Sequence, residues 1–283
     1  MKTILSLVIF AAVFFGINTV SQAQILDSPR DDVYDKIHLN EKKPIPYSPV
    51  READIAYEKR IWRTIDLRQK INHAFYYPET PKKGWKNFMT VVMDAIREGT
   101  VTAYDPTDDQ FLVPLTYQEI ESKLSSIDTM PVVDPNNPDR ILRYDVIKED
   151  FDSRVVQRLQ LKEDWFFDRQ RSQMDVRILG ICPIMNVYDE DDNFLGFEKM
   201  FWIYFPEARP VFAQSLVFNR QNGAEKRTYD ELFWKRIFGS YITKEENVYD
   251  REIADYATGM DALLEAERIK NELREYEHSL WEF

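Results

Sequence analysis

The feature that most constrains the fold is a succession of three apolar segments in the second half of the chain. All three are rich in Ile, Val, Phe, Trp and Tyr, and the short polar stretches DEDDN and PEAR separate them; they are residues 175–188, 194–204 and 211–218. β-Branched and aromatic residues bounded by turn residues are typical of strands, and short connections join antiparallel neighbours. We therefore expect an antiparallel β-meander in this half of the chain.

Most of the remaining sequence is expected to be helical. Long stretches without turn residues, several of them with apolar side chains at spacings of three and four, predict helices over residues 53–75, 85–98, 151–172 and 260–281. Thr116, Thr228 and Thr243 each precede a glutamate by three residues. That is the spacing of a capping box, so each threonine is expected to begin a helix. Helices combined with an antiparallel sheet predict an α+β fold.

The first 52 residues contain two segments that precede the predicted domain. Residues 1–23 combine Lys2 with an apolar run and a small-x-small end, which is typical of a secretory signal peptide. The run is shorter than the roughly 20 residues that a membrane anchor requires. Residues 24–52 contain four prolines and predict an extended tail, either a passive linker or a segment that lies on a partner's surface. Residues 53–283 make up the α+β domain, with a loop and a possible internal boundary near 130–140.

Charge and cysteine content exclude several classes of protein. The chain carries 49 Asp and Glu against 37 Lys and Arg, a formal charge of -12 that repels phosphate backbones and anionic lipids alike. We therefore expect neither nucleic-acid binding nor direct membrane insertion. Cys182 is the only cysteine, so no disulfide forms within the chain and no cysteine near residue 23 is present to carry a lipid. Its apolar surroundings predict a buried, inert thiol.

No local motif assembles an active site. The eight glycines lie far apart, which excludes a glycine-rich phosphate loop, and there is no Gly-x-Ser-x-Gly motif. The three histidines, His38, His73 and His278, have no neighbours at metal-ligand spacing. The acidic turn at 189–193 resembles the start of a calcium loop, but Phe194 stands where that loop requires glycine. We therefore expect no catalytic residue, no metal and no cofactor, although a pair of facing carboxylates stays open.

Two groups of apolar side chains are candidates for contacts with partners. Trp165, Phe166 and Phe167 are consecutive, and consecutive side chains on a helix point about 100° apart, so one buried stripe does not cover all three. Burial between two layers of the same domain is the alternative. The C-terminal helix carries a seam at spacings of three and four, formed by Ile269, Leu273, Tyr276 and Leu280. Packing of this seam on its own domain is favoured over packing on a neighbouring subunit.

Long segments of the sequence carry a family resemblance. They are KEDWFFDRQRSQMDVRILGICP from Lys162, DELFWKRIFGSYITKEENVYDREI from Asp230 and DALLEAERIKNELREYEHSLWEF from Asp261. WRTIDLRQKINHAFYYP from Trp62 and GTVTAYDPTDDQFLVPLT from Gly99 extend the likeness over residues 53–283. Together they resemble the GldN family, also called PorN, of the Bacteroidota type IX secretion and gliding machinery.

This resemblance implies a non-enzymatic structural subunit in the periplasm, peripherally associated with the outer membrane. It implies self-association in a ring with the lipoprotein GldK (PorK) and contact with the periplasmic shaft protein GldM (PorM). Two other classes stay open from the residues alone: a periplasmic carboxylate-based hydrolase, and a soluble carbohydrate- or peptide-binding module. Facing carboxylates in a pocket would favour the hydrolase, whereas an exposed aromatic surface would favour the subunit.

Overall fold

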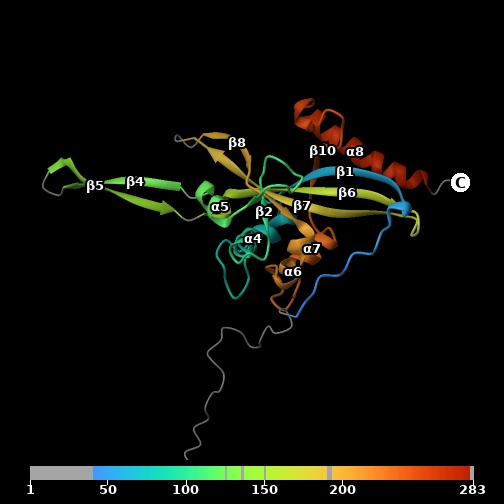
Figure 1. The fold of residues 1–283 in the computed structure, drawn as a ribbon, viewed down its shortest axis with the longest axis horizontal. Helices are drawn as coiled ribbons and strands as arrows, with labels where there is room; N and C mark the ends of the chain where they lie inside the picture. Colours follow the sequence, from blue (N-terminus) through green and yellow to red (C-terminus); the bar gives the residue numbers. More distant parts are fainter. Residues whose placement is uncertain (1–40, 125, 135–136, 150, 190–192, 281–283) are drawn as a thin grey trace, which may run out of the picture. The chain divides into compact units, whose positions relative to one another are not determined.

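The computed structural model describes residues 41–124, 126–134, 137–149, 151–189 and 193–280, and it shows the expected α+β fold (Figure 1). Eight strands of the described chain form one antiparallel sheet, in which seven follow the order β10–β1–β6–β7–β9–β2–β3 and β8 pairs with β7. Their bounds are β1 Ile55–Asp66, β2 Ala103–Tyr104, β3 Pro114–Leu115, β6 Val156–Asp168, β7 Gln173–Tyr188, β8 Phe194–Lys199, β9 Trp202–Tyr204 and β10 Tyr241–Glu245.

The described residues also contain six α-helices and several short 3-10 turns. The helices are α3 His73–Tyr76, α4 Phe88–Arg97, α5 Tyr117–Leu124, α6 Phe205–Gln214, α7 Tyr229–Trp234 and α8 Met260–Ser279. The 3-10 turns are η1 Glu52–Asp54, η2 Lys70–Asn72, η3 Ser153–Val155 and η4 Ile253–Asp255.

Two long segments that were predicted as helices are strands. Residues 53–75 contain β1, and residues 151–172 contain β6, which lies between β1 and β7 in the sheet. Both predictions were wrong for the same physical reason. A strand that is covered on both faces carries apolar residues without strict alternation, and its broad apolar content imitates a buried helix. In β1, for example, the adjacent residues Ile61 and Trp62 are both buried, and they belong to two different clusters.

The predicted meander is confirmed for its first two segments and wrong for the third. β7 pairs antiparallel with both β8 and β9. Residues 211–218 were expected to form a strand, but helix α6 occupies residues 205–214. Pro206 lies in the first turn of α6. Proline is favoured there because its missing amide hydrogen would have had no partner in the helix.

Two shorter predictions also need correction. Thr243 begins no helix, because it lies in β10, which pairs with β1 and buries Ile242. Residues 130–140 were expected to form a loop, but they belong mostly to β4 Ser126–Asp134 and β5 Asn137–Glu149, a separate two-stranded antiparallel sheet. Pro131 and Pro138 lie within these two strands, and proline is tolerated there because each strand is an edge strand of a two-stranded sheet.

The predicted helix ends agree better with the structure. Asn87 caps α4 by accepting a hydrogen bond from the Thr90 amide at 2.7 Å, and Gly99 follows the helix with a φ of 72°. Glycine adopts that left-handed conformation without the steric cost that other residues meet. Thr116 and Glu119 form the expected capping box at the start of α5, with N–O distances of 2.8 and 3.3 Å. Thr228 likewise accepts from the Glu231 amide at the start of α7.

Two clusters of buried side chains hold the helices to the sheet. The larger one joins α4, α6 and α7 to the sheet through interlocked aromatic rings, among them Phe75, Phe88, Phe205, Phe212 and Phe233. The second cluster joins α8 to β1 and β10. Two segments at the margins of the fold lie outside these clusters, residues 41–48 and strand β8.

Candidate partner-binding site

Residues 41–48, here called the arm, lie on the folded domain without forming a helix or a strand. Pro44 and Pro46 fix their own backbone angles and donate no amide hydrogen, so this sequence does not enter a ladder. The arm instead contacts α6, α7 and β7 through side chains and single carbonyl groups. It therefore binds to the domain in the manner of an extended peptide ligand.

The arm is anchored on a buried ion pair between α6 and α7. Arg209 Nε lies 2.8 Å from Asp230 Oδ1, and Arg209 Nη2 lies 3.2 Å from Asp230 Oδ2. Both side chains are nearly inaccessible, with exposed fractions of 6% and 5%. Asp230 lies in the first turn of α7, where the helix dipole also stabilises a carboxylate. Arg209 Nη2 further donates to the carbonyl of Ile45 at 2.7 Å.

Tyr47 is the side chain by which the arm enters the domain. Its ring centroid lies 5.1 Å from that of Trp234, and the guanidinium groups of Arg209 and Arg177 lie 4.3 and 5.1 Å from the ring centre. Cations above an aromatic face are attracted by its quadrupole. Burial is the main cause that raises the pKa of the Tyr47 hydroxyl, so the ring stays neutral under physiological conditions.

Two further contacts hold the ends of the arm. Arg177 Nη2 donates to the carbonyl of Ser48, and Lys42 Nζ forms an ion pair with Glu231 of α7. Glu231 therefore contacts the arm directly, whereas Asp230, in the same turn of α7, acts through Arg209. The contacts along the arm alternate between its side chains and its backbone carbonyls. They therefore hold the arm on the domain and also determine which arm residue lies opposite which groove residue.

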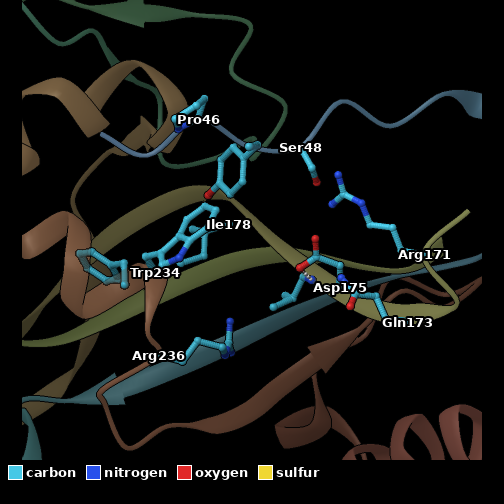
Figure 2. A pocket seen from close by; sticks show the side chains of 11 residues that line it. Pro46, Ser48, Arg171, Gln173, Asp175, Ile178, Trp234 and Arg236 are labelled. Carbon is cyan, nitrogen blue, oxygen red and sulfur yellow. Dashed lines mark hydrogen bonds between the residues drawn. The ribbon is translucent and has the colours of Figure 1, made fainter. Parts of the chain in front are cut away.

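A cavity of about 480 Å³ lies between the arm and the domain. Pro46, Tyr47 and Ser48 form one side of it, and residues of β7 and of the α7 region form the other (Figure 2). Arg171 and Arg236 are among the lining residues, whereas Asp175 is the only carboxylate among them. This cavity is therefore a cationic and aromatic groove and lacks a pair of facing carboxylates.

Strand β8 presents a second unusual surface. Tyr188, Phe194, Leu195 and Phe197 are exposed by 50 to 65%, and the rings of Phe194 and Phe197 lie 4.9 Å apart. The guanidinium group of Arg158 lies 3.7 Å from the centre of the Phe197 ring. No other described strand pairs with the outer edge of β8. An exposed aromatic patch on an unpaired strand edge is typical of a site for protein contacts.

The first predicted group of contact residues lies on β6 rather than on a helix. Phe166 and Phe167 are buried, with exposed fractions of 5% and 8%. Trp165 is half-buried, packs against the α8 cluster and donates from Nε1 to Glu163 Oε2 at 3.1 Å. The helical argument for an outward-facing ring was therefore wrong, because adjacent strand side chains point to opposite faces and both faces are covered here. Whether any of the three contacts a partner stays a prediction.

The second predicted group forms the seam of α8. Ile269 and Leu273 are buried with Ala266 against Ile61 of β1 and Ile242 of β10. Tyr276 stacks on Tyr57 with ring centroids 4.1 Å apart, and Leu280 is half-buried. The expected packing of this seam on its own domain is confirmed. A partner contact by these side chains stays a prediction.

The remaining chemical candidates do not assemble. Among the described residues, no group of three or more His, Cys, Asp or Glu is arranged to hold a metal ion. His38 and the centre of the acidic turn, residues 190–192, lie outside the described residues. Cys182 is fully buried as expected, and desolvation raises the pKa of its thiol to about 12. None of the helices in the described ranges has the length and apolar content that crossing a bilayer requires.

Sequence reasoning missed the residues that receive the arm. Arg209 lies in the PEAR stretch that was interpreted as a turn, and Asp230 was interpreted only as part of a helix start. Ile45 and Arg209 are separated by 164 positions, so no local pattern links them. The signal that was available was the KKPIPYSP stretch itself, in which a tyrosine follows two spaced prolines.

The fold and these surfaces define an α+β protein whose distinctive features are a peptide-like arm in a groove and an exposed aromatic strand. The sequence model of a family described as "Gliding motility associated protein GldN" matches residues 50–282, which is most of the chain. The chain belongs to the GldN family, and the resemblance found in the sequence is confirmed. A comparison with curated proteins finds no match.

Proposed function

We propose that the chain is a non-enzymatic structural subunit of the type IX secretion and gliding machinery. In this proposal it is exported with removal of residues 1–23, lies in the periplasm at the outer membrane, and forms a ring with the lipoprotein GldK (PorK). It also contacts the shaft protein GldM (PorM). The observation that carries the proposal is the family match over residues 50–282, which associates the chain with gliding motility.

The surface of β8 supports an assembly role. A stable protein interface needs a desolvated centre that is rich in aromatic side chains and arginine. Phe194 and Phe197 of β8 provide that composition together with Tyr188 at the end of β7 and Arg158 of β6, and the outer edge of β8 is free within the described chain. An exposed cluster of this kind is costly for a protein that works alone, because it promotes association. In a multi-subunit ring, the same cluster becomes a buried contact.

The carboxylate-based hydrolase is less well supported than the subunit. Its acid would need an environment that favours the protonated carboxyl group. A second hollow contains Asp109, Glu246 and Asp250. Asp109, however, accepts from Trp62 Nε1 at 2.7 Å and lies 3.2 Å from Lys162 Nζ, while Asp250 lies 2.5 Å from Lys244 Nζ. Two of the three carboxylates are therefore engaged by structural hydrogen bonds and ion pairs.

Co-purification tests the proposal directly. A tagged chain, expressed in the bacterium that naturally produces it, should retain the GldK-type lipoprotein after mild solubilisation. Electron microscopy of the purified complex should show closed rings. The double variant Phe194→Ser/Phe197→Ser should keep the melting temperature of the wild type and lose the lipoprotein or the ring. Tyr249→Ser removes another exposed aromatic ring, 75% exposed and outside the patch, and should change neither. A wild-type chain that purifies alone as a monomer would refute the proposal.

A further inference from the structure

The arm and its groove have the properties of a ligand and its receptor. The polar contacts to Ile45 and Ser48 are made through backbone carbonyls, and the ring of Tyr47 fills the space between Trp234 and Arg209. No ladder joins the arm to a neighbouring strand. The groove therefore recognises an extended segment with a tyrosine at one position, and this recognition does not depend on which copy of the chain supplies it.

The connection between the arm and the domain is exposed. Residues 49–54 lie between Ser48 and the start of β1, and Pro49, Arg51, Glu52 and Ala53 are exposed. Such a connector makes few contacts that would be lost if the arm left its groove. Exposed connectors of this kind are where identical segments are exchanged between copies at low energetic cost.

We infer that, in the assembled complex, the groove of each copy holds the arm of a neighbouring copy of this chain. The inference rests on the proposed function, which places many copies side by side. The contacts made by Arg209, Trp234 and Glu231 are the same within one copy and between copies, so the choice depends on geometry and local concentration. Neighbours held side by side in a ring bring the arm of one copy close to the groove of the next, so the exchange becomes a step within one assembly.

Exchange would also supply the type of contact that a ring requires. An arm that passes from each copy to the next makes a head-to-tail interface, in which different surfaces of the two copies meet. Head-to-tail interfaces generate closed rings when the rotation between neighbours closes. The groove and the arm are already complementary, so no additional surface needs to be assumed. The aromatic patch on β8 is then left for a different partner.

Cross-linking of two singly substituted chains tests this inference. One copy carries an epitope tag and Lys42→Cys in the arm, and the other is untagged and carries Glu231→Cys in the groove. Both wild-type side chains are about one quarter exposed, at 25% and 26%, so the new thiols are accessible to a short bis-maleimide. Cys182 is fully buried and its neutral thiol gives no background reaction. The two copies are co-expressed with the lipoprotein, and the complex is purified before cross-linking.

A matched control uses an ion pair that cannot exchange without unfolding the sheet. Lys59 of β1 and Glu245 of β10 lie 2.6 Å apart and are similarly accessible, at 22% and 18%. Copies carrying Lys59→Cys and Glu245→Cys separately should give no tagged–untagged product. A chain carrying both substitutions should cross-link internally.

The expected result is a tagged–untagged dimer from the Lys42→Cys and Glu231→Cys copies, at least ten times more abundant than from the control copies. A chain with both Lys42→Cys and Glu231→Cys should give a ladder of linked copies. The inference is overturned if the rings form but the mixed copies give no dimer and the double variant cross-links only internally. If size-exclusion chromatography of the purified complex shows no ring even with wild-type chains, the proposed function has failed, and the inference fails with it.

Discussion

The arm and helix α8 are both peripheral segments attached to the same domain, but different forces hold them. Helix α8 is held by an apolar seam, with Ile269 fully buried and Leu273 exposed by 4%. The arm is held by a buried ion pair, two backbone carbonyls and one half-buried tyrosine ring. An apolar seam gains its stability from the area removed from water, and it is lost only with the fold. The arm has far less apolar area to lose, so its contacts can open while the domain stays folded.

The largest effect is expected from Leu273→Asp in the α8 seam. An unpaired carboxylate would replace a buried side chain in the cluster around Ile269 and Ile61, at a cost of about 4 kcal/mol. For a domain of this size, that cost lowers the melting temperature by roughly 8 to 16 °C. Differential scanning calorimetry of the purified chain measures it. Leu264→Asp on the exposed side of α8 should leave the melting temperature unchanged, and equal melting of both variants would contradict the assignment of the seam.

A somewhat smaller effect is expected from Arg209→Ala. The substitution leaves the carboxylate of Asp230 buried without its partner, which costs about 3 kcal/mol, and it also removes the donor to the Ile45 carbonyl. Urea unfolding should show the loss of stability. The paired variant Arg209→Met/Asp230→Leu should recover most of it without restoring the arm contact. A single variant as stable as the wild type would contradict a buried ion pair whose carboxylate depends on Arg209.

Tyr47→Ala should weaken the docking of the arm without changing the stability of the domain. The loss of the ring contacts should destabilise the docked arm by about 1 kcal/mol, because each cation–π contact contributes roughly 0.5 to 1 kcal/mol. The melting temperature of the domain should stay within about 2 °C of the wild type. Trypsin should then cleave the Lys42–Lys43 bond several times faster, as mass spectrometry of timed digests would show. Ile45→Ala, at a side chain that is 54% exposed, is the control and should leave the cleavage rate unchanged.

The smallest effect on the stability of the domain is expected at Cys182, where no residue is substituted and the reactivity of the native thiol is measured. Burial raises the pKa of this thiol to about 12, so it binds its proton in the folded state at pH values where an unfolded cysteine has lost it. The stability that this provides is complete below the ordinary thiol pKa and is lost as the pH rises toward 12. At pH 8.5 a thiol reagent should react roughly 100 times more slowly with the native chain than in denaturant. Rapid native labelling would show that the interior opens locally.

The sequence was sufficient for the helix ends and for the seam of α8, because the signals for both are local. Asn87, Thr116 and Gly99 lie within a few residues of the groups that they cap. A seam at spacings of three and four likewise identifies one face of one helix. The fold class followed from these features together with the polar turn that separates β7 from β8.

The central strands and the groove could not be predicted, because both depend on contacts between distant parts of the chain. Whether an apolar stretch such as β6 forms a strand is decided by the neighbours that cover it, here β1 and β7. The pairing of Arg209 with Ile45 likewise brings together two segments that carry no common motif. The exposed rings of Phe194 and Phe197 would have been identified only by knowing that β8 lacks a second neighbour.

The guanidinium groups of Arg209 and Arg177 bind the arm by its carbonyl oxygens, which every residue possesses. Such recognition places little constraint on the identity of residues 45 and 48 and a strong constraint on the distance between them. Over evolutionary time most residues of the arm can therefore be substituted, whereas insertions and deletions between residues 45 and 48 are excluded because they change that distance. A comparison of related chains should show substitutions along this segment at constant length, with an aromatic residue retained at the position of Tyr47.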